Sequence, residues 1–254
     1  MSTPPVLQDC RALVTGGAKG IGAAISERLA AAGADLVVSG RNAVELDAYA
    51  AQLADRTGRK VAVVAADLAE PDAPERLADE AWAALDGLDL LVNNAGMSIT
   101  GPAAEVRAAD WDAVLAVNLR APALLAARIG GRMAEAGGGR IVTVASAAGL
   151  RALPEHYSYC ASKAALVMAT RVLALELGPR GVRANSICPT VVLTEMGIQV
   201  WGDEAKSAPM LARIPAGHFA QPVDVAEAVV YLASPAAEMI NGTELVLDGG
   251  YLAT

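Results

Sequence analysis

Residues 15–22 read Thr15-Gly16-Gly17-Ala18-Lys19-Gly20-Ile21-Gly22, a glycine-rich turn between a short apolar run and an amphipathic segment. A tight turn from strand to helix needs glycine where φ is positive, and glycine lets a ligand approach the main chain. The start of a helix offers unpaired N–H groups and a positive dipole end, which favour a phosphate. We therefore predict that the phosphates of a dinucleotide bind at Gly16, Gly20, Ile21 and Gly22; the alternative is a tight turn that binds nothing.

Short apolar runs alternate with longer alanine-rich stretches along the whole chain. The runs are mostly continuous in Val, Ile and Leu, a pattern typical of parallel strands covered on both faces. We expect strands at 11–14, 35–39, 60–65, 88–92, 140–145, 182–188 and 244–247. We expect helices at 21–32, 41–57, 74–85, 108–136, 158–177 and 222–233. This alternation predicts an α/β fold of Rossmann type: a doubly wound, seven-stranded parallel sheet flanked by helices.

No linker, low-complexity tract or charge block divides the 254 residues, so we predict a single domain spanning 1–254. The segment 194–220 is its least regular part. There the sequence leaves two interpretations open, a substrate-side lid spanning about 190–220 or a merely irregular loop.

Composition excludes several classes of function. Hydrophobic residues make up 54% and charged residues 19% of the chain, which is typical of a globular protein. A formal net charge of −8 argues against binding to nucleic acid or to an anionic membrane surface. The three cysteines and two histidines show no metal-ligand spacing, so we expect no metal site and no disulfide. We see no signal peptide and no run of 18 uncharged apolar residues, and we expect a cytoplasmic protein without a membrane span.

The end of the second predicted strand bears on the choice of cofactor. An acidic residue there would bind the ribose 2′-hydroxyl of NAD, whereas this sequence reads Ser39-Gly40-Arg41. Arg41 can pair with a 2′-phosphate, and Lys19 in the glycine-rich turn can reach the same group. We therefore predict a preference for NADP(H), with NAD(H) still possible. The alternative for Arg41 is a solvated residue at a helix start.

A second group of polar residues follows the fifth predicted strand. Tyr159 and Lys163 are four residues apart and so share one face of a helix, and Ser146 precedes the tyrosine by 13 positions. A free tyrosine has a pKa near 10 and is a poor base, but a nearby ammonium group, together with an oxidised nicotinamide ring, would favour its phenolate form. Tyr157 has no such partner, because the residue four positions further on is Ala161.

Together these motifs resemble the short-chain dehydrogenase/reductase family over nearly the whole chain. The spacing of Gly16, Gly20 and Gly22, the Asn93-Asn94-Ala95-Gly96 motif and the Asp248-Gly249-Gly250 tail are all similar to that family. The resemblance implies an enzyme that moves hydride between a nicotinamide cofactor and a carbonyl or alcohol group. It implies a catalytic tetrad of Asn118, Ser146, Tyr159 and Lys163, and further cofactor contacts at Asp67, Asn94, Ala95, Gly96, Tyr159, Lys163, Pro189 and Thr194.

A closer likeness covers residues 185–201 and 210–215, which resemble the L-xylulose or dicarbonyl reductases of that family. This resemblance implies a ketose/polyol pair or a small α-dicarbonyl as substrate. It assigns Leu153, His156 and Trp201, together with Ser146, to the substrate pocket. Ala147 departs from it, because those reductases usually carry a glutamine there, and Leu153 and Met196 would make the pocket more apolar.

Three other functions stay open. A 3-oxoacyl-thioester reductase would share the tetrad, as would an NAD(H)-dependent alcohol or polyol dehydrogenase. A nucleotide-sensing module without catalysis would have no need of Tyr159 and Lys163. The long apolar helices predicted at 108–136 and 158–177, which the family usually pairs between subunits, lead us to expect a homotetramer.

Overall fold

The computed structural model describes residues 5–194, 197–198 and 201–254, and its strands form one seven-stranded sheet. The strand order is β3-β2-β1-β4-β5-β6-β7, and every neighbouring pair is parallel. This confirms the predicted doubly wound fold, and each predicted strand lies within two residues of an observed one. The strands are β1 (Arg11–Thr15), β2 (Asp35–Gly40), β3 (Val61–Ala65), β4 (Leu90–Asn93), β5 (Gly139–Val144), β6 (Val182–Pro189) and β7 (Glu244–Leu247).

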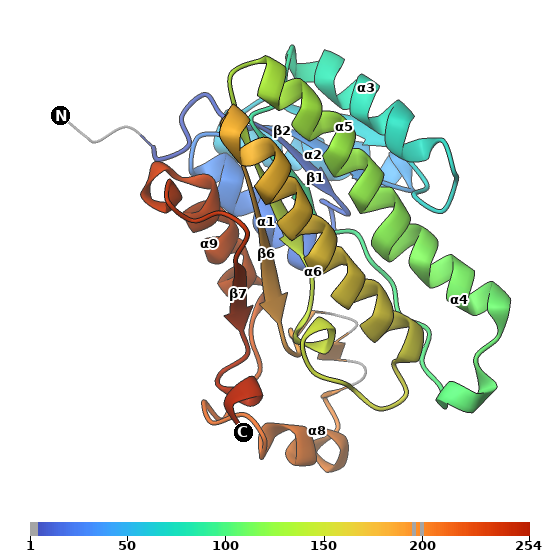
Figure 1. Cartoon of the computed structure of the whole chain (residues 1–254). Coiled ribbons are helices and arrows are strands. Elements are labelled where there is room, and N and C mark those ends of the chain that lie inside the picture. The colour runs from blue at the N-terminus through green and yellow to red at the C-terminus, as the bar shows by residue number, and fades with distance from the viewer. Residues whose placement is uncertain (1–4, 195–196, 199–200) are drawn as a thin grey trace.

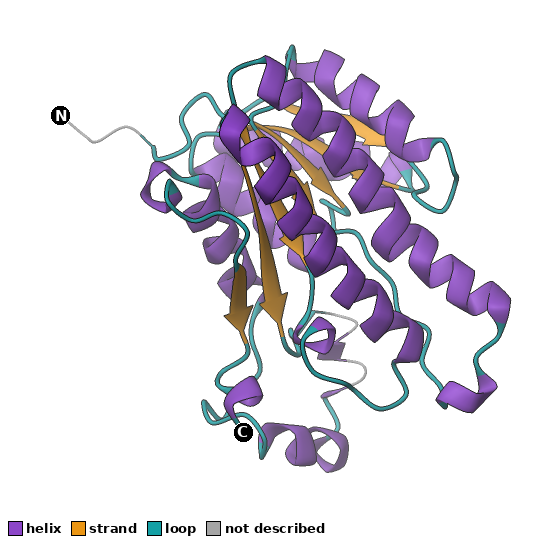
Figure 2. Cartoon of the chain, in the orientation of Figure 1, coloured by secondary structure: helices purple, strands orange, loops and turns teal. Residues whose placement is uncertain are grey.

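Helices cover both faces of the sheet (Figures 1 and 2). One layer holds α3 (Ala73–Leu85), α4 (Ala108–Leu115), α5 (Ala121–Glu135) and α6 (Tyr157–Leu177). The other layer holds α1 (Gly20–Ala31), α2 (Ala43–Thr57) and α9 (Pro222–Ala233). The short helix α8 (Glu204–Leu211) lies apart from both layers, beyond the carboxyl ends of β6 and β7 (Figure 1).

The strand β1 shows why the apolar runs are continuous. Successive side chains of a strand point to opposite faces of the sheet. Leu13 packs into the core beneath α3 and α5, whereas Ala12 and Val14 pack into the core beneath α1 and α9. All three side chains are fully buried. Both faces therefore need apolar residues, and no polar alternation remains in the sequence.

The long helix predicted at 108–136 is interrupted, which corrects that prediction. A π-helical turn, Ala116–Arg120, separates α4 from α5, and Asn118 lies at its centre. Pro122, two residues after this turn, has no N–H to donate to the carbonyl of Asn118, so a regular α-helical hydrogen bond is missing there. The combined segment Ala108–Glu135 is long enough for a membrane span and holds an 18-residue window with a mean hydropathy of 1.4. Two of its arginines nonetheless form ion pairs with the same helix: Arg128 and Arg132 contact Asp79 of α3 at 3.0 and 2.7 Å.

One boundary and one further helix also differ from prediction. The helix expected from residue 41 begins at Ala43, because Asn42 caps it by accepting a hydrogen bond from the Glu45 N–H at 3.3 Å. Within the segment expected to be irregular, α8 forms despite Pro209, which lies inside it. Whether this segment acts as a lid stays a prediction.

Candidate active site

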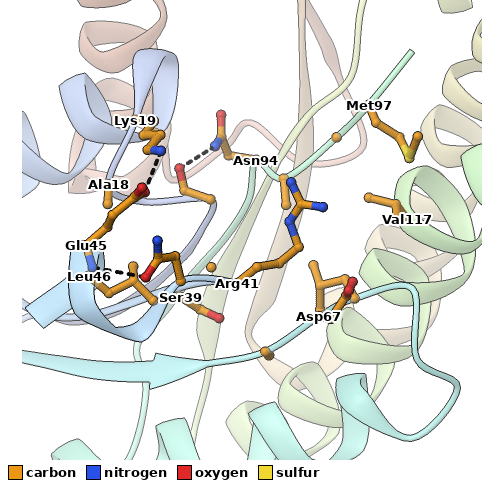
Figure 3. A pocket seen from close by; sticks show the side chains of 18 of the residues that line it. Ala18, Lys19, Ser39, Arg41, Glu45, Leu46, Asp67, Asn94, Met97 and Val117 are labelled. Atoms are coloured by element: carbon orange, nitrogen blue, oxygen red, sulfur yellow. Dashed lines mark hydrogen bonds and ion pairs between the residues drawn. The ribbon is translucent and has the colours of Figure 1, made fainter. Parts of the chain in front are cut away.

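The carboxyl ends of the strands nearest the centre of the sheet border a cavity of about 1180 Å³ (Figure 3). Such a position is where open α/β sheets bind their ligands. Most of the residues predicted to bind the cofactor line this cavity: Gly16, Lys19, Gly20, Ile21, Gly22, Arg41, Asp67, Asn94, Ala95, Gly96 and Thr194. Pro189, Tyr159 and Lys163 are not among the lining residues.

The glycine-rich turn has the backbone geometry that its sequence predicted. Gly16 adopts a φ of +63°, and a Cβ on Gly22 would lie 1.9 Å from the carbonyl oxygen of Gly16. Only glycine therefore lets the first turn of α1 approach the loop so closely. Lys19 is the N-cap of α1, but in the described structure its side chain makes no capping hydrogen bond and the first turn of the helix has no acidic residue. The N-terminal N–H groups of α1 thus fit an anionic group such as a pyrophosphate.

The segment after β4 braces this turn. The Asn94 side-chain amide donates to the carbonyl oxygens of Thr15 and Gly16, at 2.9 and 3.3 Å. The Thr15 hydroxyl accepts hydrogen bonds from the backbone N–H groups of Asn94 and Ala95, at 3.0 and 3.1 Å. The side chain of Asn94 therefore acts on the loop that would hold the cofactor, which is a positioning role.

The mouth of the cavity carries two cationic side chains from different elements. Arg41 extends into the cavity from the end of β2, with Asp67 nearby (Figure 3). Within the described residues no carboxylate forms an ion pair with Arg41. Lys19, in contrast, forms an ion pair with Glu45 of α2. Glu45 was not among the predicted site residues, although the Asn42-x-x-Glu45 spacing is a capping pattern that places it in the first turn of a helix.

The four residues of the predicted tetrad come together beside this cavity. The Lys163 ammonium donates a hydrogen bond at 2.9 Å to the Val144 carbonyl, at the end of β5. A Cβ on Gly96, which lines the cavity, would lie 3.5 Å from both Lys163 Nζ and Asn118 Oδ1. The Lys163 Nζ atom lies 5.7 Å from the centroid of the Tyr159 ring. The Ser146 hydroxyl, at the start of the short 3-10 turn that follows β5, accepts from the Ala148 N–H at 3.1 Å.

Asn118 is held by the backbone of Met97, one of the residues that line the cavity. Its side chain accepts from the Met97 N–H and donates to the Met97 carbonyl, both at 2.8 Å. It also donates to the Ser162 hydroxyl at 3.2 Å, and that hydroxyl donates to the Tyr159 carbonyl at 2.7 Å. Ser162 was missed as a site residue, because its position within the Tyr159–Lys163 turn gives no separate sequence signal.

Burial dominates the ionisation of Tyr159 and Lys163. Desolvation raises the pKa of Tyr159, and the neighbouring Ser146 hydroxyl only partly offsets this effect. Desolvation also lowers the pKa of Lys163 to about 8, so its amine is still mostly protonated at neutral pH. In the protein alone Tyr159 is therefore a neutral phenol able to donate a proton. The phenolate expected beside an oxidised nicotinamide ring stays a prediction.

The residues assigned to the substrate pocket divide into two groups. The His156 ring lies 6.0 Å from the Tyr159 ring, centroid to centroid, and Leu153 accepts a hydrogen bond from the His156 N–H at 3.3 Å. Trp201 instead packs against Phe219, with ring centroids 5.8 Å apart, in a small apolar cluster beyond the sheet. The substrate role of Trp201 thus stays a prediction, and Met196 lies outside the described residues.

Comparison with known proteins assigns this site to a family. Residues 16–252 match the family described as enoyl-(acyl carrier protein) reductase. The chain is 47% identical to D-threitol dehydrogenase of Mycolicibacterium smegmatis, covering 94% of this chain and 92% of that one. It is 41% identical to L-xylulose reductase of Mesocricetus auratus, over 96% and 97% of the two chains. It superimposes with a TM-score of 0.94 and 40% identity on the crystal structure of a putative NAD(P)-dependent gluconate 5-dehydrogenase from Beutenbergia cavernae with bound NADP, covering 99% and 100%.

The chain therefore belongs to the short-chain dehydrogenase/reductase family, as its motifs implied. It is an oxidoreductase that acts on CH–OH groups, and a nicotinamide cofactor is supported by the relative with NADP bound.

Proposed function

We propose that this enzyme interconverts a ketone and a secondary alcohol of a small ketose/polyol pair, with NADP(H) as the preferred cofactor. The observation that carries the proposal is the position of Gly96, which borders the cofactor cavity and would place a Cβ 3.5 Å from both Asn118 and Lys163. The cavity and the tetrad are therefore two parts of one site. The names of the two curated relatives favour a polyol or a ketose as substrate.

The residues that would hold the cofactor are distributed around this cavity. Gly16, Gly20, Ile21 and Gly22 would surround the pyrophosphate, and Arg41 with Lys19 would bind a 2′-phosphate. Asp67 would contact the adenine, Thr194 and Pro189 the nicotinamide end, and Tyr159 with Lys163 the nicotinamide ribose. Asn94, Ala95 and Gly96 would complete the cavity wall. When bound, the nicotinamide supplies or takes up the hydride.

The chain's own residues would transfer the proton and stabilise the charge that this transfer leaves behind. Tyr159, a neutral phenol in the protein alone, would donate its proton to the carbonyl oxygen in reduction. Ser146 would hold that oxygen by a hydrogen bond, and the Lys163 ammonium would stabilise the phenolate left behind. Asn118, held by the backbone of Met97 at 2.8 Å, would keep a proton path open toward Lys163.

The substrate itself would lie between Ser146, Leu153, His156 and Trp201. L-xylulose is one fitting ketose, and a small α-dicarbonyl is the second candidate that the resemblance supports. Ala147 removes a polar contact that hydroxylated substrates would otherwise find, and buried polar contacts decide such discrimination.

A substrate panel tests this function. Initial rates of NADPH oxidation should be measured with L-xylulose, diacetyl and an acetoacetyl thioester, with NADH in parallel. We expect kcat/KM for L-xylulose or diacetyl to exceed that for the thioester by at least about tenfold. A faster thioester reaction would replace the proposal with the acyl-thioester alternative.

We also propose that the enzyme is a cytoplasmic homotetramer. Met168, Val172 and Leu175 of α6 are exposed at 54%, 44% and 78%, and Leu124 of α5 at 52%, which leaves apolar surface for a second subunit. Light scattering of the purified protein measures the oligomeric state, and a monomeric mass would refute the proposed tetramer.

A further inference from the structure

The Lys19–Glu45 ion pair lies at the mouth of the cofactor cavity, between the glycine-rich turn and α2 (Figure 3). Both side chains line the cavity, together with Arg41. One of the two cations available to a 2′-phosphate is thus already paired with a carboxylate. That carboxylate belongs to Glu45 of α2, and none of the family motifs described above includes this residue.

Local structure fixes where the Glu45 side chain starts. Its backbone N–H donates to the Asn42 side chain at 3.3 Å, which places Glu45 in the first turn of α2. The hydrogen bond from Lys19 lowers the pKa of Glu45, so this residue carries a full negative charge at neutral pH. The negative charge also lies at the positive end of the α2 dipole, which favours it there.

The pair is exposed, and this decides how strong its effect can be. The Lys19 and Glu45 side chains are 75% and 47% exposed. Exposed ion pairs are weak and screened by salt, so Glu45 cannot prevent a phosphate from binding. A 2′-phosphate would nevertheless have to share Lys19 with Glu45 and would meet a like charge beside it. A ribose 2′-hydroxyl is neutral and can donate a hydrogen bond to a carboxylate, so NAD(H) carries no such penalty.

We propose that Glu45 is a cofactor-selectivity residue that weakens the binding of a 2′-phosphorylated nucleotide and so narrows the preference for NADP(H) over NAD(H). This inference rests on the proposed NADP(H) function and deepens it. Arg41 and Lys19 provide the attraction for the phosphate, Glu45 opposes it, and Asp67 on the far side of Arg41 is the other carboxylate lining the cavity.

Binding of nucleotide fragments tests this directly, without activity as the readout. The affinities of adenosine 2′,5′-bisphosphate and of 5′-AMP should be measured by calorimetry for the wild type and for Glu45→Gln. The variant keeps the backbone N–H that bonds Asn42, so α2 should remain capped. We expect the bisphosphate to bind about three- to tenfold more tightly to the variant, with 5′-AMP changed less than about twofold. The gain should shrink in about 0.5 M salt.

Two further variants make the result specific. Glu27→Gln is the matched control, because Glu27 also forms an exposed ion pair, with Arg56 at 2.8 Å, and is not among the residues lining the cavity; it should leave both affinities unchanged. Unchanged or weaker bisphosphate binding in Glu45→Gln would overturn the proposal, since Glu45 would then have no effect on the phosphate or would hold Lys19 in place for it.

Arg41→Ala tests the NADP(H) function separately. If Arg41→Ala weakens bisphosphate binding while Glu45→Gln has no effect, only the inference about Glu45 fails. If neither variant changes bisphosphate binding, the inference about Glu45 and the proposed preference for NADP(H) both fail.

Discussion

Lys163 and Tyr159 lie one helical turn apart on α6, with the Lys163 Nζ atom 5.7 Å from the centre of the Tyr159 ring. The hydrogen bond from Lys163 to the Val144 carbonyl ties this turn to the end of β5. A buried ammonium is thereby fixed close to the phenol that would lose its proton. The lysine is held in place by the fold and, as the only charged member of the tetrad, governs the electrostatics of the site.

Burial of Lys163 should make stability depend on pH in a defined direction. Its pKa is lowered from 10.5 to about 8 in the folded chain, so between these values the unfolded chain binds more protons and stability rises with pH. Below about pH 8 both states hold the proton and the full penalty applies. Urea unfolding of the cofactor-free protein should show the wild type gaining about 2 kcal/mol relative to Lys163→Met between about pH 7.5 and 9.5. Parallel curves for the two proteins would show that Lys163 is not desolvated.

Arg41 should determine affinity for the phosphorylated cofactor. Arg41→Asp removes a charge-assisted contact and places a carboxylate at the end of β2, where it can accept from a ribose 2′-hydroxyl. We expect the Kd for NADPH to rise at least about tenfold, corresponding to about 1.4 kcal/mol, while the Kd for NADH stays equal or falls. Titration of NADPH and NADH fluorescence measures both. Unchanged NADPH binding would place the 2′-phosphate elsewhere.

Gly22 should tolerate no side chain. A Cβ there would meet the Gly16 carbonyl oxygen at 1.9 Å and the Asn94 amide nitrogen at 2.6 Å, so Gly22→Ala must displace the turn. We expect a loss of about 1–3 kcal/mol in unfolding free energy and a large loss of nucleotide affinity. Gly131→Ala in α5 is the control, because a Cβ there meets nothing within 4 Å. It should stabilise the helix by about 0.5–1 kcal/mol. Equal effects of both changes would refute the close-approach explanation.

Tyr251 should anchor the segment that carries Trp201. Its buried ring lies between two guanidinium groups, with Arg151 at 5.0 Å and Arg213 at 4.9 Å from the centroid. Arg151 also donates to the Tyr251 carbonyl at 2.8 Å, so the loop after Ser146 is joined to the segment after β7, and Arg213, which follows α8, packs on the same ring. Tyr251→Ala should destabilise the protein by about 3 kcal/mol and raise the substrate KM more than the cofactor Kd.

The conservative change Tyr251→Phe keeps the ring and separates this positioning role from a loss of folding. Chemical denaturation and steady-state kinetics should give near wild-type values for it. If Tyr251→Ala raised the cofactor Kd as much as the substrate KM, the contact would be a general stabilising one.

The sequence predicted those parts of the molecule that depend on local pattern. Continuous apolar runs located all seven strands, because both faces of the sheet are buried, as Leu13 and Val14 show. The spacing of Gly16, Gly20 and Gly22 located the cavity, because the close approach at Gly22 admits no other residue.

The remaining features depend on contacts between distant segments. The helix α8 is held by an apolar cluster that includes Tyr251, about forty residues further along the chain, and its own pattern is broken by Pro209. The Lys19–Glu45 pair likewise joins two elements that are separate in the sequence. The burial of Tyr159, which no motif encodes, raises the pKa of its phenol in the protein alone.

The most direct test compares the wild type with Tyr159→Phe in NADPH oxidation driven by L-xylulose or diacetyl, with NADPH binding measured on the same samples. Removing the phenolic proton donor should lower turnover by about 10²–10⁴-fold while NADPH affinity changes less than about threefold. That result would establish Tyr159 as the proton donor of a carbonyl reductase. Comparable turnover by the two proteins, or no NADPH oxidation by the wild type with either substrate, would contradict the proposed reaction.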